Sequence, residues 1–306
     1  MDRFRELTTF VTAAESGAFN AAARKLNMSP AAVTRLINSL EARIGARLFT
    51  RTTRKVALTE AGQLFLSDAT RILDALEEAE ASAAGAHQSP SGILRVTGPL
   101  MFGQLYVAPI LRDYLDAYPA VSASTLFVDR VVNLIEEGLD VAVRIGDLPD
   151  SSLSAVRVGE VRRMIVAAPS YVAKHGAPET LDALTDHKII QPLPLYRSPD
   201  WPFVNGGKTQ SVKINPALTV NTMLASIDAA LAGWGITRVY SYQVAGALLD
   251  GTLVEMLDNA DEYRAPIHLV HPEGRRASAK TRAFVTLATK RLRADAKLFI
   301  GDACQT

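Results

Sequence analysis

Residues 18–54 read AFNAAARKLNMSPAAVTRLINSLEARIGARLFTRTTR, and the order of the parts in this stretch decides the fold. A short segment with an apolar stripe comes first, and a second striped segment follows a turn at Asn27. Asn27 tolerates the left-handed backbone of a turn, Ser29 is a typical helix N-cap, and Pro30 suits the first helical turn. An arginine-rich tail ends the stretch. This order predicts a helix-turn-helix followed by a basic wing.

The second helix of such a motif places its N-terminal part in the major groove of DNA. Arg35 can bond a guanine edge, Thr34 can contact a base or a phosphate, and Ala31 can meet a thymine methyl. For Arg35, a phosphate contact or a solvated position is an equal alternative. Arginines at the tip of a wing hold phosphates or probe the minor groove. The predicted DNA-contacting residues are Ser29, Pro30, Ala31, Thr34, Arg35, Asn38, Arg51, Thr53 and Arg54.

Charge is distributed unevenly along the 306 residues. Residues 1–60 contain ten Lys and Arg against five Asp and Glu, a formal charge of +5, while the remainder has 23 against 27, or −4. A basic head on a mildly acidic body indicates that the head meets a polyanion, with chance as the alternative. The chain shows no apolar run of membrane-spanning length and no secretory signal. Its single cysteine, Cys304, excludes an internal disulfide. We expect a cytoplasmic protein.

A long helix is predicted to follow the head, from about Thr59 to Gly85. Its apolar residues are spaced 4, 3, 4, 3, 4, which is a heptad seam that favours a partner helix. The alternative is that the helix packs on its own chain. The tract HQSPSG, residues 87–92, is the predicted hinge into the body. The residues predicted to form the dimer seam are Phe65, Ala69, Ile72, Leu76, Ala79 and Ala83.

The rest of the chain alternates short apolar strands with helices, which predicts an α/β body with parallel sheets. One set of strands and helices starts near residue 93, with a helix expected around Val131–Glu137, and a second set starts near Arg163. The stretch PIHLVHP, residues 266–272, is predicted to return to the first set, and a last helix is expected at about 279–292.

The pattern AA..L..S..AVT..I..LE..IG..LF.R..R.V.LT.AG, spanning residues 22–62, resembles the DNA-binding head of LysR-type transcriptional regulators. One departure is Pro30, because many members have a glutamine there that can contact adenine. The body resembles the effector domain of the same family, which is similar to type 2 periplasmic binding proteins. The resemblance implies a multidomain α/β fold: a winged helix-turn-helix (1–58), a linker and dimerisation helix (59–88), and a two-lobed effector domain (89–306). Lobe I would comprise about 93–162 and 267–300, and lobe II about 163–266.

By the same resemblance, the partners are double-stranded promoter DNA, a small-molecule effector in the cleft between the lobes, and further copies of the chain in a homodimer or homotetramer. RNA polymerase is a further candidate partner. Leu100 and Met101 stand where relatives often have serine or threonine, and Tyr240 stands where they have proline. These changes favour an aromatic effector, or a carboxylate held by helix amides and Arg144; ordinary packing is the alternative. The predicted effector residues are Leu100, Met101, Phe102, Arg144, Asn221, Thr222 and Tyr240.

Catalytic chemistry is not predicted. The five histidines are dispersed, and no HExxH, GxSxG, Walker or dinucleotide-binding motif occurs. We therefore predict no catalytic residue, no cofactor and no metal site. A small-molecule-binding module without a transcriptional role would explain the body alone. It would leave the head, the wing and the heptad linker without a purpose.

Overall fold

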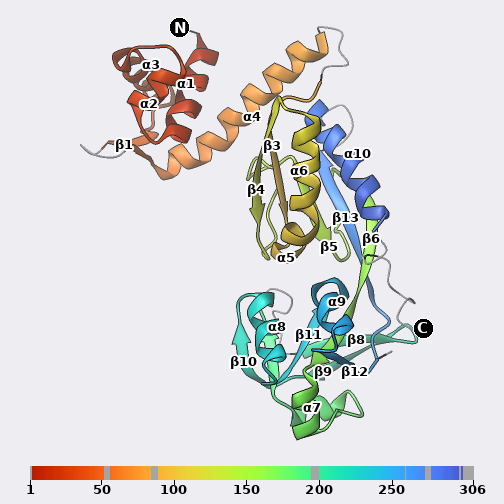
Figure 1. The fold of residues 1–306 in the computed structure, drawn as a ribbon. Helices are drawn as coiled ribbons and strands as arrows, with labels where there is room; N and C mark the ends of the chain where they lie inside the picture. The colour runs from red at the N-terminus through yellow and green to blue at the C-terminus, as the bar shows by residue number, and fades with distance from the viewer. Residues whose placement is uncertain are drawn as a thin grey trace. The chain divides into compact units, whose positions relative to one another are not determined.

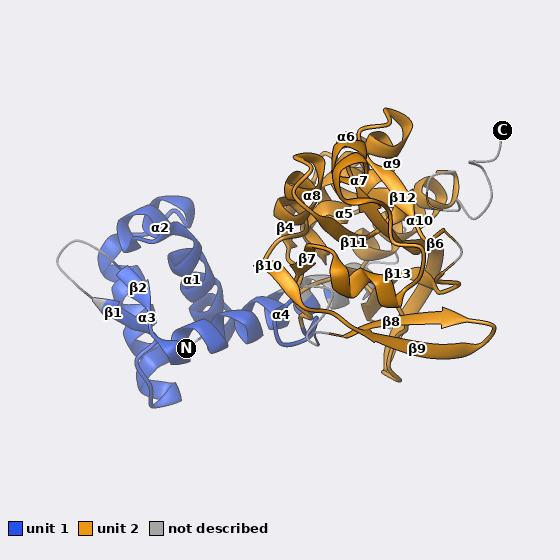
Figure 2. Ribbon diagram, turned by 90° about the horizontal axis from the view of Figure 1, so that it is seen from below, with its two compact units in different colours: residues 1–88, 133–138 blue, residues 89–132, 139–306 orange. Residues whose placement is uncertain are grey.

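The computed structural model describes residues 2–51, 56–83, 89–193, 200–258, 260–272, 277–295 and 298. The chain forms two compact units (Figure 2): residues 1–88 with 133–138, and residues 89–132 with 139–306. None of the helices in the described ranges has the length and apolarity that crossing a membrane requires. The first unit contains α1 (Arg3–Ser16), α2 (Phe19–Lys25), α3 (Pro30–Ile44), β1 (Phe49–Arg51), β2 (Val56–Leu58) and α4 (Glu60–Ala83).

The helices of the head begin and end where their capping residues stand. The Ser29 hydroxyl accepts a hydrogen bond from the Ala32 amide at 3.2 Å and starts α3. Gly17 and Gly45 adopt the left-handed conformation and end α1 and α3. Asn27, with φ of 51°, makes the turn between α2 and α3. The helix-turn-helix is therefore set by local residue choices.

One apolar cluster holds the head together, and α4 contributes to it. The Phe10 ring lies 5.3 Å from that of Phe49 and 5.2 Å from that of Phe65. Ala22 and Ala23 are buried, which allows α2 to approach its neighbours closely. Ile44, the last residue of α3, is 37% exposed.

In the predicted dimer seam on α4, Ala69 is wrong because it is fully buried, and Phe65 is partly buried in the head. Ala69 is fully buried and Phe65 packs on Phe10, both within the same head. A heptad pattern cannot tell a partner helix from α1, which offers the same kind of apolar face. Ile72 remains 44% exposed and Leu76 half-buried. The side chains of Ala79 and Ala83 lie outside the described residues.

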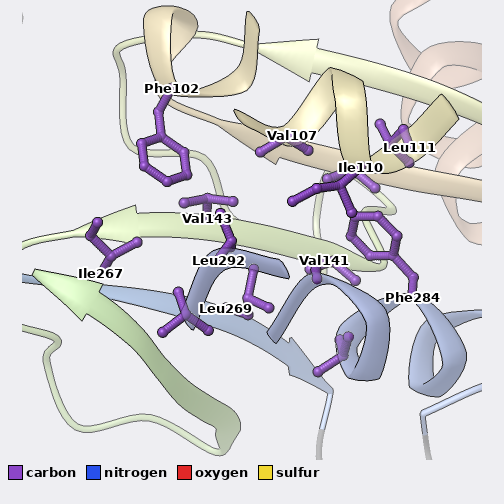
Figure 3. Packing of buried hydrophobic residues seen from close by; sticks show 14 of the residues in the cluster. Phe102, Val107, Ile110, Leu111, Val141, Val143, Ile267, Leu269, Phe284 and Leu292 are labelled. Atoms are coloured by element: carbon purple, nitrogen blue, oxygen red, sulfur yellow. The ribbon is translucent and has the colours of Figure 1, made fainter. Parts of the chain in front are cut away.

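Lobe I is a sheet in which β4, β3 and β5 run parallel, and β13 runs antiparallel to both β5 and β6. Figure 3 shows side chains from its helices and strands meeting in one buried cluster, with Phe102, Ile110, Val143 and Phe284 among them.

The prediction of a helix around residues 131–137 is wrong. Asn133 instead closes a turn, because its side chain accepts hydrogen bonds from the Ile135 and Glu136 amides. The elements of lobe I are β3 (Gly92–Gly98), α5 (Leu100–Phe102), the π-helical η1 (Gly103–Val107), α6 (Ala108–Ala117), β4 (Val121–Phe127), β5 (Val141–Ile145), the first part of β6 (Leu153–Ala167), β13 (Arg264–Pro272) and α10 (Ala279–Arg293).

Lobe II has the strand order β10-β7-β11-β6, with β12 also paired to β6. Its hairpin β8–β9 was not predicted, although Asn205-Gly206-Gly207 is a turn signal and both glycines have positive φ. The elements of lobe II are α7 (Pro169–His175), the 3₁₀ helix η2 (Asp182–Asp186), β7 (Ile189–Pro192), β8 (Asp200–Asn205), β9 (Lys208–Lys213), β10 (Pro216–Val220), α8 (Met223–Leu231), β11 (Ile236–Tyr240), α9 (Ser241–Leu249) and β12 (Val254–Met256).

Two strands, β6 and β13, connect the lobes (Figure 1). Strand β6 pairs with β13 as far as Arg162 and with β11 from Arg163 onward. The change of partner at this point divides the sheet into the two lobes. Any movement of one lobe against the other must therefore bend the chain near Arg162 and Arg264.

Candidate nucleic-acid interface and interlobe site

The N-terminal part of α3 presents an open polar face. Ser29, Pro30, Ala31, Arg35 and Asn38 are exposed, and Thr34 is half-buried. Within the described ranges, the Arg35 guanidinium makes no ion pair or hydrogen bond with the rest of the chain. Its five N–H donors are therefore available to an external acceptor.

A buried glutamate fixes α3 against α1. Glu6 on α1 accepts a hydrogen bond from the Ser39 hydroxyl at 2.7 Å and pairs with Arg43 at 2.9 Å. Burial raises the pKa of this carboxyl, but the bonds from Ser39 and Arg43 outweigh burial and hold the pKa below its usual value. The recognition helix is thus held at a defined angle.

A second buried glutamate, Glu41, joins α3 to the wing. Its carboxylate accepts from the backbone amides of Leu48 at 2.8 Å and Phe49 at 3.1 Å, and from Arg47 at 2.9 Å. Burial again raises the pKa, and the bonds from Leu48, Phe49 and Arg47 together lower it below the ordinary value. Neither glutamate was predicted as a site residue, since its partners become neighbours only after folding.

The wing itself is an antiparallel pair in which Phe49 lies opposite Leu58 and Arg51 opposite Val56. The predicted contacts Thr53 and Arg54, and the side chain of Arg51, lie outside the described residues. At the base of the wing, the Thr59 hydroxyl donates to the Arg47 carbonyl at 2.6 Å and accepts from the Gly62 amide at 3.0 Å. These bonds anchor the wing to the start of α4.

Met101 and Tyr240 lie where the two lobes meet. Met101 packs against the buried clusters of both lobes, and Tyr240, at the end of β11 in lobe II, packs against that of lobe I. Tyr242, on α9 of lobe II, is buried in the lobe I cluster, with its ring 5.3 Å from Phe102. Burial, the largest effect, raises the pKa of Tyr242. The junction is therefore aromatic, and its main contributor, Tyr242, was not predicted.

The prediction that Phe102 contacts an effector is wrong. Phe102 is fully buried and stacks on Tyr106 with 4.7 Å between ring centroids. Burial likewise raises the pKa of Tyr106, to about 12. The four-residue spacing of these aromatics places them on one face of a helix. That spacing was the signal that Phe102 belongs to the core.

Three of the remaining predicted effector residues, Leu100, Arg144 and Thr222, make hydrogen bonds within the chain. The Leu100 amide donates to the Asp129 carboxylate at 3.0 Å, so a carboxylate of the chain itself occupies the start of α5. Arg144 donates to the Val132 carbonyl. Thr222 caps α8 by accepting from the Ala225 amide at 3.3 Å. Asn221 is exposed. The Leu100 amide, one of the helix amides at which a carboxylate was expected, is therefore already bonded to a carboxylate of the chain.

Comparison with known proteins covers both units. Residues 4–63 match the model of bacterial regulatory helix-turn-helix proteins of the lysR family, and residues 87–293 match the LysR substrate-binding domain. The regulator CrgA of Neisseria meningitidis serogroup C is 30% identical over 288 residues, which are 94% of this chain and 96% of CrgA.

Solved structures agree with these matches. The structure of CrgA, a LysR-type regulator from Neisseria meningitidis, is 30% identical with a TM-score of 0.61, and the match covers 94% of this chain and 98% of that chain. The full-length Vibrio cholerae virulence activator AphB is 26% identical with a TM-score of 0.61, over 94% of this chain and 99% of that chain. The likeness extends through head, linker and body.

Proposed function

The chain belongs to the LysR family of bacterial transcriptional regulators, and on that premise we propose how its parts work together. It is a DNA-binding regulator with an effector-binding body. We propose that two heads bind the two halves of a dyad operator, and that an effector between the lobes alters the spacing of the heads. The open face of α3 is the observation that carries this proposal.

The DNA contact is proposed to centre on Arg35. Its exposed guanidinium has no partner within the described ranges, and the helix that bears it is fixed by Glu6 and Glu41. Pro30 cannot supply the adenine contact that glutamine makes. Arg35 and the wing residues Arg51 and Arg54 therefore contribute more to the discrimination between DNA sequences. The other proposed DNA contacts are Ser29, Ala31, Thr34, Asn38 and Thr53.

Pairing of the heads is proposed to use α4, shifted from the predicted seam. Phe65 and Ala69 serve the core of the head, while Ile72 and Leu76 are available to a partner helix. Leu64, 71% exposed, lies eight residues before Ile72, about 80° away from it around the helix. We propose a homodimer through this face. A homotetramer through the bodies would build on it.

The effector is proposed to bind at the junction of the lobes, in contact with Met101 and Tyr240. The Asp129 carboxylate on the Leu100 amide disfavours a second carboxylate there. An aromatic, non-anionic molecule is therefore the effector class that these residues favour.

We propose that the protein has no catalytic role and that it is located in the cytoplasm, where the chromosome lies. We also propose that RNA polymerase is the partner through which binding at the promoter affects transcription.

Footprinting tests the dyad proposal. The full chain should protect two half-sites about one or more helical turns apart in the DNA upstream of its own or a neighbouring gene. Scrambling one half-site should weaken protection of the other, because the two heads belong to one dimer. If the intact half-site is protected equally well after the other half-site is scrambled, the paired-head proposal is contradicted.

A further inference from the structure

A hollow of about 300 Å³ opens on lobe II, and none of its lining residues belongs to the predicted effector set. Its walls come from the loop before η2, from the β8–β9 hairpin and from the segment after β12, which lie in the same lobe (Figure 1). The volume is at the lower end for small-molecule sites in proteins.

The chemistry of this lobe II hollow is divided between its mouth and its floor. The exposed carboxylates Glu179 and Asp258 stand at the mouth, and the buried Phe203 ring and the half-buried Leu257 form the floor. Leu257 has φ of 51°, a left-handed conformation that costs a non-glycine residue roughly 1–3 kcal/mol and that concentrates at functional sites. Two carboxylates select a cation, and an apolar floor selects an apolar group.

We propose that the lobe II hollow is a second small-molecule site, separate from the lobe junction, and that it binds a small organic cation: a protonated amine that carries an apolar group. The ammonium lies between Glu179 and Asp258, and the apolar group covers Phe203 and Leu257. Asn205 and Gln210, also on the wall, supply hydrogen-bonding amides.

The floor of the hollow is connected to the strands that join the lobes. The Phe203 ring lies 4.1 Å from the Arg238 guanidinium, which pairs with Asp261. Asp261 also pairs with Arg163 at 3.0 Å and accepts from the Tyr263 amide at 3.2 Å. Arg163 stands where β6 changes partner, and Tyr263 directly precedes β13. A chain of contacts therefore links Phe203 to both crossover strands.

Calorimetric titration of the full chain tests this site with three probes of matched shape: phenethylammonium, phenylacetate and 2-phenylethanol. Phenethylammonium should bind in the millimolar range or better, and more tightly than the other two. The double substitution Glu179→Gln with Asp258→Asn should raise its Kd by roughly three- to tenfold, since each exposed carboxylate contributes a fraction of a kcal/mol.

The matched control is Asp228→Asn with Asp250→Asn, which removes two exposed carboxylates of the same lobe that do not line the hollow. It should leave the Kd unchanged. Equal binding of phenylacetate or 2-phenylethanol, no binding of any probe, or an equal effect of the two double variants would overturn the proposal. Because the titration uses neither DNA nor effector, its outcome is independent of the proposed regulatory function.

Discussion

At the scale of single residues, the head depends on two buried carboxylates rather than on its exposed charges. Glu6 accepts hydrogen bonds from Ser39 and Arg43, and Glu41 accepts them from Arg47 and from the Leu48 and Phe49 amides. Each ties α3 to another element, Glu6 to α1 and Glu41 to the wing. Arg35 is the exposed cation that we propose to contact DNA, and these glutamates fix the helix that carries it.

Glu41→Gln should destabilise the head by about 1–3 kcal/mol, because the bonds to the Leu48 and Phe49 amides lose their charge assistance. Hydrogen exchange of peptides from residues 36–51 should rise, whereas Glu15→Gln, at an exposed position on α1, should change it little. Unchanged exchange in Glu41→Gln would contradict the role assigned to this carboxylate.

The same carboxylates predict a pH dependence. The pKa values of Glu6 and Glu41 are lowered in the folded head. Their contribution to stability is therefore complete above the unfolded value of about 4.3, and it is lost as the pH falls through the folded pKa values. The difference in exchange between wild type and Glu41→Gln should shrink below that pH. A difference that persists or grows in acid would show that charge is not its source.

Arg35→Ala should weaken binding to the specific operator by about 1–3 kcal/mol if the guanidinium bonds a base edge. Binding to unrelated DNA should change less. Arg112→Ala, which removes an exposed arginine from α6 of the body, is the matched control and should leave both affinities unchanged. Equal losses for specific and unrelated DNA would reassign Arg35 to a phosphate.

The residue scale also separates what sequence can predict from what it cannot. The caps at Ser29, Gly17 and Gly45 were predictable because each acts on backbone within a few positions. Glu6 was not, because its partners Ser39 and Arg43 are 33 and 37 residues away. A glutamate in an amphipathic helix gives no sign that it is buried until α1 and α3 are packed.

At the scale of elements, α4 packs in the head at its start, and we propose that it pairs with a second chain further along. Its first turns complete the core of the head through Phe65 and Ala69. The apolar residues that remain exposed are then free to pair with a second chain. The heptad spacing predicted the helix and its apolar face, but not this division, since spacing does not identify the surface that a stripe contacts.

Ile72→Glu should therefore raise the dissociation constant of the dimer by at least about tenfold, because an isoleucine buried in an interface contributes roughly 1.5–3 kcal/mol. Sedimentation equilibrium measures this change directly. Gln63→Glu is the control, because nine residues place it on the opposite side of the helix and it is also exposed. Dissociation by Gln63→Glu but not by Ile72→Glu would show that another face of α4 pairs.

At the scale of the whole molecule, the body is two lobes connected by β6 and β13, with an aromatic junction between them. Alternation of strands and helices predicted the α/β class and most elements. It could not show that Tyr242 of lobe II would enter the core of lobe I, because that contact depends on how the lobes close. Phe102 is a different case, because its four-residue spacing from Tyr106 already marked it as a core residue.

The lobe junction makes its own prediction. Replacing Met101 and Tyr240 together by serine should change which metabolites raise the melting temperature of the full chain in a thermal-shift screen. The control, Leu249→Ser, replaces an exposed apolar residue of α9 in lobe II. Identical ligand responses in wild type and the double variant would remove the effector from this junction.

The central claim is that the basic head binds specific DNA for the rest of the chain to regulate. Equilibrium binding of the full chain to the DNA upstream of its own and neighbouring genes, measured across a salt series, tests it most directly. We predict that one upstream fragment binds more tightly than unrelated DNA. The logarithm of its binding constant should fall linearly with the logarithm of the salt concentration, because phosphate contacts release counterions. Absence of DNA binding at any salt concentration, or equal affinity for every fragment, would contradict it.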